Sequence, residues 1–176
     1  MKLRFKSLIL IQDVYFSHSM QLCIISALQS DVTFSTALAK AQTISRKYSC
    51  STKAKDILKR CGFGQRLTLG SKTWWSELEM VKKIIGAYES NSLNAMIREM
   101  KWSEEILWSE ILILKSYVAI FTVFAQSSDF LDSEKNTTIA LVYPIINILM
   151  RTLAKQDHAV KQFTTNLDKL LTDRFK

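Results

Sequence analysis

The residues of this sequence that are best suited to chemistry are cations interleaved with aromatic rings between Lys40 and Lys83. This basic segment holds 11 Lys and Arg residues against three acidic residues. Its aromatic residues are Tyr48, Phe63, Trp74 and Trp75. Cations neutralise phosphates, and aromatic rings offer stacking surfaces to unpaired bases. The pattern indicates a nucleic-acid-binding surface, and the alternative is a solvated basic face over core aromatics. Trp102 and Trp108 lie outside the segment and are expected in the core.

Residue types that support metal or covalent catalysis are sparse. The only histidines are His18 and His158, and no cysteine or carboxylate stands at metal-ligand spacing to them. The sequence contains no C-x-x-C, no G-x-S-x-G and no glycine-rich phosphate loop. We therefore expect no metal, no cofactor and no catalytic residue. The cysteines are expected to be structural thiols in a reducing, intracellular compartment, and they are Cys23, Cys50 and Cys61.

Length and composition favour an all-α fold. With 176 residues the chain is long enough for one domain with a substantial core, and 48% of its residues are hydrophobic. Glycine occurs 4 times and proline once, too rarely for a sandwich or barrel of many short strands. The net charge of +8 is uneven, because residues 1–88 hold 14 Lys and Arg against 5 acidic residues, and the second half holds 10 against 11. A polyanionic partner, nucleic acid or an anionic membrane surface, is expected to contact the first half.

The basic segment must be positioned by helices. Apolar spacing predicts helices over residues 17–29, 33–47, 51–61, 72–88, 93–100, 103–126 and 157–175, with a further one from Thr137 or Thr138 that contains Pro144. The helix that begins near Ser51 should stop at Gly62. Loops are predicted over residues 63–71, which contain two glycines, and over residues 127–136, which are mostly polar. The result is a single helical bundle.

Two stretches resemble membrane-directed segments. The first 14 residues begin like a signal peptide, but their apolar run is short and Gln12 and Asp13 end it without a cleavage site, so we expect no secretion. The stretch from Ile106 to Ala125 has the length that a bilayer needs. It contains Glu110 among its apolar residues, so a helix buried in a bundle is expected, and no membrane partner.

Several stretches of the sequence follow one another in a recognisable order. They are FSHSMQL (Phe16 to Leu22), FSTALAKAQTISRKYSCSTKAKDILK (Phe34 to Lys59), KTWWSELEMVKKII (Lys72 to Ile85), KWSEEILWSEILILKSYVAIFTVFAQSSDFLDSEKNTTIALVYPIINILMRTL (from Lys101) and DKLLTDRF (from Asp168). Together they resemble the hAT transposases and their domesticated BED zinc-finger relatives. The resemblance covers about Tyr15 to Phe175, nearly the whole chain.

The resemblance implies a place in a larger architecture. In hAT transposases a large all-helical insertion interrupts an RNase H-like catalytic core. Residues 1–30 look like a remnant of the C-x-x-H region, and residues 31–176 look like the first part of that insertion. The three acidic residues of the family's DDE site have no counterpart here, so the resemblance implies no transposase activity. It also implies a nuclear location.

The resemblance singles out two residues. His18 matches the family histidine that lies near the cleaved phosphate, although Tyr15 stands where the family has cysteine. Trp75 matches the tryptophan of the T-R-W-x-S motif, which stacks on DNA, although Trp74 replaces its arginine. A helix-capping His18 and a core-packed Trp75 are the alternatives. The candidate nucleic-acid-binding residues are therefore His18, Lys53, Lys55, Lys59, Arg60, Arg66, Lys72 and Trp75.

The sequence thus predicts a catalytically inactive, transposon-derived fragment that binds DNA through its basic first half, largely without sequence preference. One alternative is a helical protein-interaction module that uses the helix from Ile106 to Ala125, and another is a decayed copy without selected function. Charge reversal at the cations of residues 53–60 should weaken DNA binding. Changes at Ile113, Val118 or Phe121 should weaken association with a protein partner.

Overall fold

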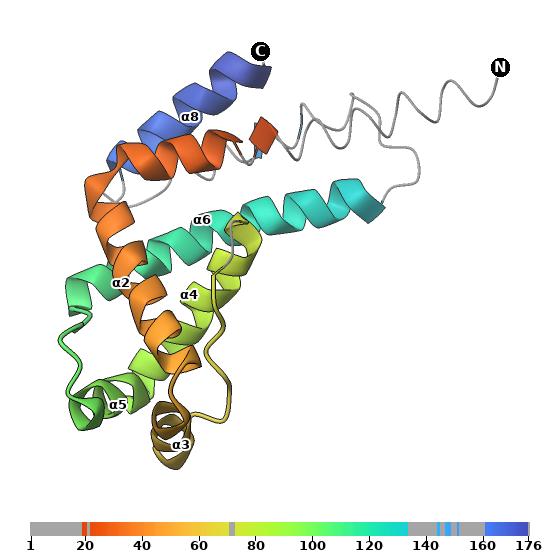
Figure 1. Ribbon diagram of the computed structural model, residues 1–176. Coiled ribbons are helices and arrows are strands. Elements are labelled where there is room, and N and C mark those ends of the chain that lie inside the picture. The colour runs from red at the N-terminus through yellow and green to blue at the C-terminus, as the bar shows by residue number, and fades with distance from the viewer. Residues whose placement is uncertain are drawn as a thin grey trace. The chain divides into compact units, whose positions relative to one another are not determined.

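The computed structural model consists of helices joined by turns and loops (Figure 1). It describes residues 19–20, 22–70, 73–133, 144, 147–148, 151 and 161–175. None of these residues lies in a β-strand, so the prediction of an all-α fold is confirmed. Contacts divide the chain into unit 1 (Met1–Asp31 with Ala119–Lys176) and unit 2 (Val32–Val118). The predicted single domain over residues 1–176 stays a prediction.

Unit 2 carries the basic segment. Its helices are α2 (Val32–Ser49), α3 (Thr52–Arg60), α4 (Trp74–Glu89), α5 (Ser92–Met100) and the first part of α6 (Trp108–Ser133). Helix α4 packs on α2 and α5, and α3 packs on the same two helices. The first four helices agree within two residues or so with those predicted from apolar spacing, because each buries one periodic face.

Helix α4 lies at the middle of the unit 2 core. Leu78, Val81 and Ile84 are fully buried, and α4 has buried residues on most of its circumference. The Tyr117 hydroxyl of α6 donates to the Trp74 carbonyl at the start of α4, at 3.4 Å. Burial raises the pKa of Tyr117, with the charge of Glu77 adding to the effect, so this hydroxyl stays protonated and keeps its role as donor.

Helix α3 begins and ends as its sequence predicts. The Ser51 side chain accepts a hydrogen bond of 3.1 Å from the Ala54 amide, which otherwise has no partner in the first turn. After Cys61, Gly62 adopts a φ of +91°, where a side chain is strained. The predicted start near Ser51 and the predicted stop at Gly62 are both confirmed, and the structure adds the Ser51 cap.

Unit 1 joins the two ends of the described chain. The helix that includes Leu22–Ser30 contacts α8 (Lys161–Phe175). In this contact the Asn166 side chain of α8 donates a hydrogen bond of 2.9 Å to the Ser30 hydroxyl. The rings of Phe121 and Phe163, both fully buried, lie 6.0 Å apart. The remaining predicted features of this unit, residues 1–18 and most of the helix from Thr137 or Thr138, fall outside the described residues.

Both ends of α6 differ from the prediction. The helix begins at Trp108 instead of Ser103, because the Glu110 carboxylate accepts the Leu107 amide at 2.8 Å and completes the first turn there. It continues to Ser133, so the predicted loop is wrong over residues 127–133. That stretch is polar but contains no glycine or proline, and nothing in its backbone chemistry ends a helix.

Helix α6 is also apolar and long enough over Trp108–Ser127 to cross a membrane, judged on length and hydropathy alone. Within unit 2 its charged side chains are engaged by protein groups. Lys115 pairs with Glu89 at 2.6 Å, and Glu110 pairs with Lys40 at 2.7 Å. These are the contacts of a helix packed in a protein, and the absence of a membrane partner stays a prediction.

The Ser51 cap gives a first test. Replacing Ser51 by Ala leaves the Ala54 amide without its partner, and the free energy of unfolding should fall by about 1 kcal/mol. Urea denaturation followed by circular dichroism measures the change. Ser51→Asp is the matched control and should keep most of the stability, since its carboxylate also accepts that bond. Equal losses in the two variants would contradict the assigned cap.

Candidate nucleic-acid interface

Helix α3 presents a row of cations on its outer side. Ala54, Ile57 and Leu58 are buried, none of them more than 2% exposed, and they anchor the helix on the rest of unit 2. Lys53 and Lys59 of the same helix are both exposed. Lys53 precedes Ile57 by four residues and so borders the buried face, whereas Lys59 follows Lys53 by six residues and lies farther from that face.

Two further cations of α3 interact with neighbouring helices, one through a hydrogen bond and one through an ion pair. Lys55 donates at 2.7 Å to the Ser49 carbonyl at the end of α2, where a cation suits both the free carbonyls and the helix dipole. Arg60 lies 2.6 Å from the Glu99 carboxylate of α5, but the two side chains are 67% and 44% exposed. Lys55 therefore contributes to folding, whereas the Arg60 pair is solvated and remains accessible.

Three other cations of the basic segment are neutralised within unit 2. Each lies against a carboxylate from the same unit, so a phosphate would have to displace that carboxylate before gaining the charge. The pairs are Lys40–Glu110 at 2.7 Å, Lys47–Glu104 at 2.5 Å and Lys82–Glu79 at 2.8 Å. The pairs of Lys40 and Lys47 are partly enclosed, whereas the Lys82–Glu79 pair, with side chains 40% and 45% exposed, is solvated like the Arg60 pair.

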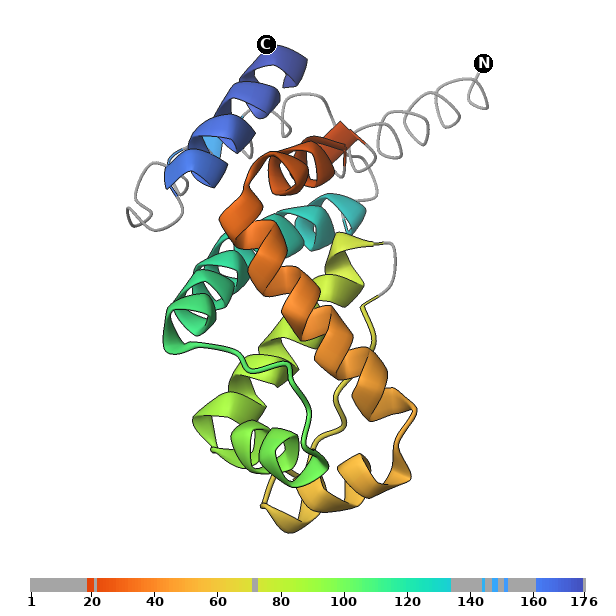
Figure 2. The ribbon, with the colours of Figure 1, turned by 60° about the vertical axis from the view of Figure 1, so that its left-hand side comes forward.

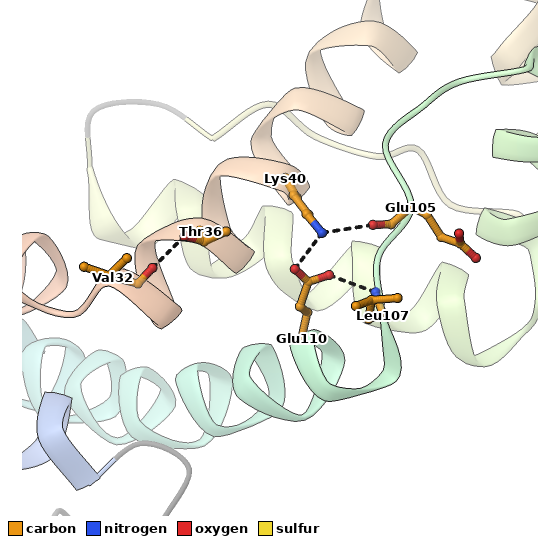
Figure 3. Close-up of polar contacts among 6 residues, drawn as sticks. All are labelled: Val32, Thr36, Lys40, Glu105, Leu107 and Glu110. Atoms are coloured by element: carbon orange, nitrogen blue, oxygen red, sulfur yellow. Dashed lines mark hydrogen bonds and ion pairs between the residues drawn. The ribbon is translucent and has the colours of Figure 1, made fainter.

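The Lys40 pair is the most enclosed of these, and Figure 3 shows its contacts. Lys40 reaches from α2 to Glu110 and also donates to the Glu105 carbonyl at 3.3 Å. Glu110 accepts from the Leu107 amide as well, and its side chain is only 14% exposed. Burial acts to raise the pKa of Glu110, but the hydrogen bonds from Lys40 and Leu107 outweigh it and hold that pKa below its usual value.

The described cations that remain are Arg46, Lys53, Lys59, Arg66 and Lys83. None of these side chains has an ion pair or hydrogen bond to any residue that the structure describes, and all but the half-buried Lys83 are exposed. Lys53 and Lys59 lie on α3, and Arg66 lies in the loop that follows it. Arg46 lies near the end of α2, and Lys83 lies on α4. We call Lys53, Lys59 and Arg66, together with Arg60, the α3 basic surface.

Trp75 has an intermediate environment. It lies in the first turn of α4 and is 41% exposed, while its neighbour Trp74 is buried. The two rings meet edge to face with centroids 5.3 Å apart. Below them Gln42 of α2 donates at 2.8 Å to Glu77, whose pKa is raised by burial although the Gln42 hydrogen bond opposes the shift. One edge of Trp75 therefore packs in the protein and the rest is available to a ligand.

Trp75 and the α3 basic surface lie at different ends of unit 2. The loop after α3 runs back along α4 to the first turn of that helix, so the start of α4 is remote from α3 in both ribbon views (Figures 1 and 2). Gly86, near the other end of α4, contacts the Phe63 ring that follows α3. The rise of an α-helix puts Trp75 roughly 16 Å from Gly86 along the axis. The structure brings the α3 cations together but does not join Trp75 to them.

The other predicted site residues cannot be placed. His18 and Lys72 fall outside the described residues. In the part of the chain that the structure describes, no three His, Cys, Asp or Glu side chains are grouped so as to hold a metal ion. Cys23 is buried, and burial raises the pKa of its thiol despite the opposing charge of Arg174, as suits a structural thiol.

Sequence reasoning missed a pocket at the end of α5. Its volume is about 250 Å³, and it is lined by Asn94, Ile97, Arg98, Trp102, Ser103 and Glu105. Trp102 was expected in the core, but it is only half-buried and forms part of this pocket. The spacing of these residues carries no motif, because the pocket arises where the chain turns back over α5.

Two of the residues expected to contact a protein partner, Ile113 and Phe121, lie in the core instead. Ile113 is 8% exposed and Phe121 is fully buried, so changes there would report on folding. The exposed apolar residues of this region are Leu107, Trp108 and Leu112, at 55%, 55% and 44%. The expectation that Trp108 lies in the core is therefore wrong. Its ring contacts the Lys115 ammonium instead, which lies 5.3 Å from the ring centroid.

Comparisons of the chain with protein-family models, with curated proteins and with solved structures found no match. The hAT resemblance is carried by the sequence motifs alone.

The Lys40–Glu110 pair predicts a pH dependence of stability. Because the pKa of Glu110 is lowered by folding, the pair stabilises the protein above the pKa of an unfolded glutamate, about 4.3, and this stabilisation is lost as the pH falls through the lowered value. Glu110→Gln should lower the free energy of unfolding by about 1 kcal/mol at pH 7, and the difference from the parent should vanish at acid pH.

Urea denaturation between about pH 3 and pH 7 measures this difference. Glu79→Gln removes the solvated partner of Lys82 and serves as control, with a smaller effect expected. A difference between parent and Glu110→Gln that stayed constant down to the lowest pH would contradict the assigned linkage.

Proposed function

We propose that this chain is a catalytically inactive, hAT transposase-derived helical fragment that binds DNA through the α3 basic surface, in the nucleus. The all-α fold agrees with a piece of the helical insertion that the sequence motifs resemble. Binding is through phosphates and is therefore largely independent of base sequence and strongly weakened by salt. The basic surface of unit 2 supplies the charge, and Trp75 offers a separate stacking face.

The observation that carries this proposal is the position of Lys53. It lies in the first turn of α3, where the helix dipole disfavours a cation, and that turn contains no acidic residue. Lys53 is exposed and has no partner among the described residues. The dipole favours an acidic residue at this position. Lys53 therefore costs the helix some stability, and a polyanionic ligand gives a reason for it.

The other α3 cations are less decisive. Lys59 and Arg60 lie in the last turn of α3, where the dipole favours positive charge, and Lys55 binds the end of α2. Their positions have a folding explanation as well as a functional one. Lys53 opposes the dipole and yet lies on the same short helix, so the cluster as a whole is better explained by a ligand than by helix stability.

Lys53→Glu separates the two explanations. The variant should raise the free energy of unfolding by roughly 0.3 to 1 kcal/mol, because an acidic residue suits the start of a helix. It should also weaken binding to duplex DNA, and it should reduce the slope of log affinity against log salt by about 1. Fluorescence anisotropy at about 50 to 200 mM salt and urea denaturation give the two readouts.

Lys169→Glu is the matched control. Lys169 is an exposed lysine of α8, and the change in net charge is the same. It should leave the affinity and the salt slope close to those of the parent. If both variants weakened binding equally, only net charge would be involved, and if the parent showed no salt-sensitive binding, the proposed function would be wrong.

A protein-interaction module is the second candidate function. The observation in its favour is the row of exposed apolar side chains Leu107, Trp108 and Leu112 at the start of α6, since solvent-facing apolar clusters often mark partner surfaces. Leu112→Asp should abolish capture of a protein partner by the tagged chain from a nuclear extract, with no loss of thermal stability. Lys53→Glu should retain that capture. The opposite pattern, or no partner captured by the parent, would contradict this function.

A further inference from the structure

The pocket at the end of α5 is shaped by an unusual backbone turn. Lys101 follows α5 with φ 53° and ψ 41°, a left-handed conformation that glycine usually occupies at helix ends. The turn is closed by the Trp102 amide, which donates to the Ile97 carbonyl at 3.0 Å. It sends residues 102–105 back over α5 and so forms one wall of the pocket. A left-handed lysine is strained, and such strain persists where the surroundings impose it.

One wall of the pocket is a tryptophan that is fixed in advance. The Lys47 ammonium of α2 lies 5.8 Å from the centroid of the Trp102 ring, and Lys47 is itself held by the Glu104 carboxylate at 2.5 Å. Ile97, only 6% exposed, supplies apolar surface beside the indole. An indole that already has contacts within the protein loses less side-chain entropy on stacking than a free one, so this wall suits a flat aromatic partner.

The polar groups of the pocket carry opposite charges. Arg98 and Glu105 both line it, and both are exposed. Figure 3 shows the Glu105 carboxylate turned away from Lys40 and Glu110, with only its backbone carbonyl bound to Lys40. Neither Arg98 nor the Glu105 carboxylate has an ion pair among the described residues. Asn94 adds an amide that can donate and accept.

Size and charge together restrict the ligand. A volume of about 250 Å³ lies below the usual range of pockets for complete small molecules, and it suits one ring of a larger ligand. A singly charged side chain would be attracted by one of these groups and repelled by the other, a cation by Arg98 and an anion by Glu105. A nucleotide satisfies both groups, because its phosphate is anionic while the exocyclic amine of cytosine or adenine donates to a carboxylate.

We infer that this pocket receives one unpaired base of a nucleic-acid strand, stacked on Trp102, with its exocyclic amine on Glu105 and its phosphate at Arg98. The inference rests on the proposed nucleic-acid function and extends it from phosphate binding to base recognition. Its position supports this, since Glu99, the residue after Arg98, pairs with Arg60 of the α3 basic surface. A strand bound along α3 therefore lies next to the helix that carries the pocket.

The test compares single strands with duplex DNA, using the complete chain. Fluorescein-labelled oligo(dC), oligo(dT) and a duplex, each of about 12 nucleotides, are titrated at low salt and followed by anisotropy. The parent should prefer oligo(dC) to oligo(dT), since thymine lacks the amine that Glu105 accepts. Trp102→Ala should weaken oligo(dC) binding by about tenfold through loss of stacking and leave duplex binding unchanged.

Two further variants keep the test decisive. Glu105→Gln alters only the exposed carboxylate, and it should remove the preference for oligo(dC) without changing the melting temperature. Trp108→Ala is the matched control, because Trp108 is a solvent-accessible tryptophan of unit 2 with a lysine over its ring, as Trp102 is, but it does not line this pocket. It should leave all three affinities unchanged.

The outcomes separate this inference from the proposed function. If Lys53→Glu weakens every probe while Trp102→Ala and Glu105→Gln change nothing, the α3 basic surface binds phosphates and the base pocket is wrong. The pocket is also overturned if Trp102→Ala weakens duplex and single strands equally, or if Trp108→Ala has the same effect as Trp102→Ala. If the parent binds none of the three probes, the proposed function fails and the pocket inference fails with it.

Discussion

The burial of α4 is the constraint on which the rest of unit 2 depends. Leu78, Met80, Val81 and Ile84 are completely buried, and each such side chain stabilises the fold by roughly 1.5 to 3 kcal/mol when removed from water. Because α4 is apolar around most of its circumference, α2 and α5 must cover it, and α3 must then pack on those two helices. The packing of α3 on α2 and α5, through Ala54, Ile57 and Leu58, is therefore what holds the α3 lysines at the surface of unit 2.

Electrostatic pairing then decides which cations remain available. The basic segment contains 11 cations, and its composition does not distinguish those that form ion pairs from those that face solvent. The fold provides carboxylates to Lys40 and Lys47 from residues more than 50 positions away, and these pairs also hold the start of α6 and the loop before it. No described carboxylate reaches Lys53 or Lys59. The difference between a structural cation and a ligand-binding cation is thus set by tertiary contacts.

Sequence reasoning succeeded where the signal is local. The helix that begins near Ser51 and ends before Gly62 was predicted because its apolar period and its stop both lie within about a dozen residues. The start of α6 was missed because the residue before it, Leu107, has no side chain that can cap a helix. The Glu110 carboxylate, which lies inside the helix, instead accepts the hydrogen bond of the Leu107 amide. The same limit applies to the candidate site. The cationic character of α3 was predictable, but the separation of Trp75 from it and the pocket beside Trp102 depend on how distant segments pack.

The two tryptophans of unit 2 that contact lysines show why local chemistry alone does not define a site. Trp102 and Trp108 each have a lysine ammonium within 6 Å of the ring centroid, so the pairing of indole and cation is the same at both positions. At Trp108 the neighbouring groups are Tyr88 and solvent, and the indole is one member of an apolar row on α6. At Trp102 the left-handed turn at Lys101 brings residues 102–105 back over α5, so that Arg98 of α5 and Glu105 line the same pocket as the indole. A flat ring held between opposite charges selects for a ligand that is itself flat and bipolar. The feature that distinguishes the two tryptophans is therefore the backbone turn, and the strain of a lysine in a left-handed conformation is explained if that turn serves to build the pocket.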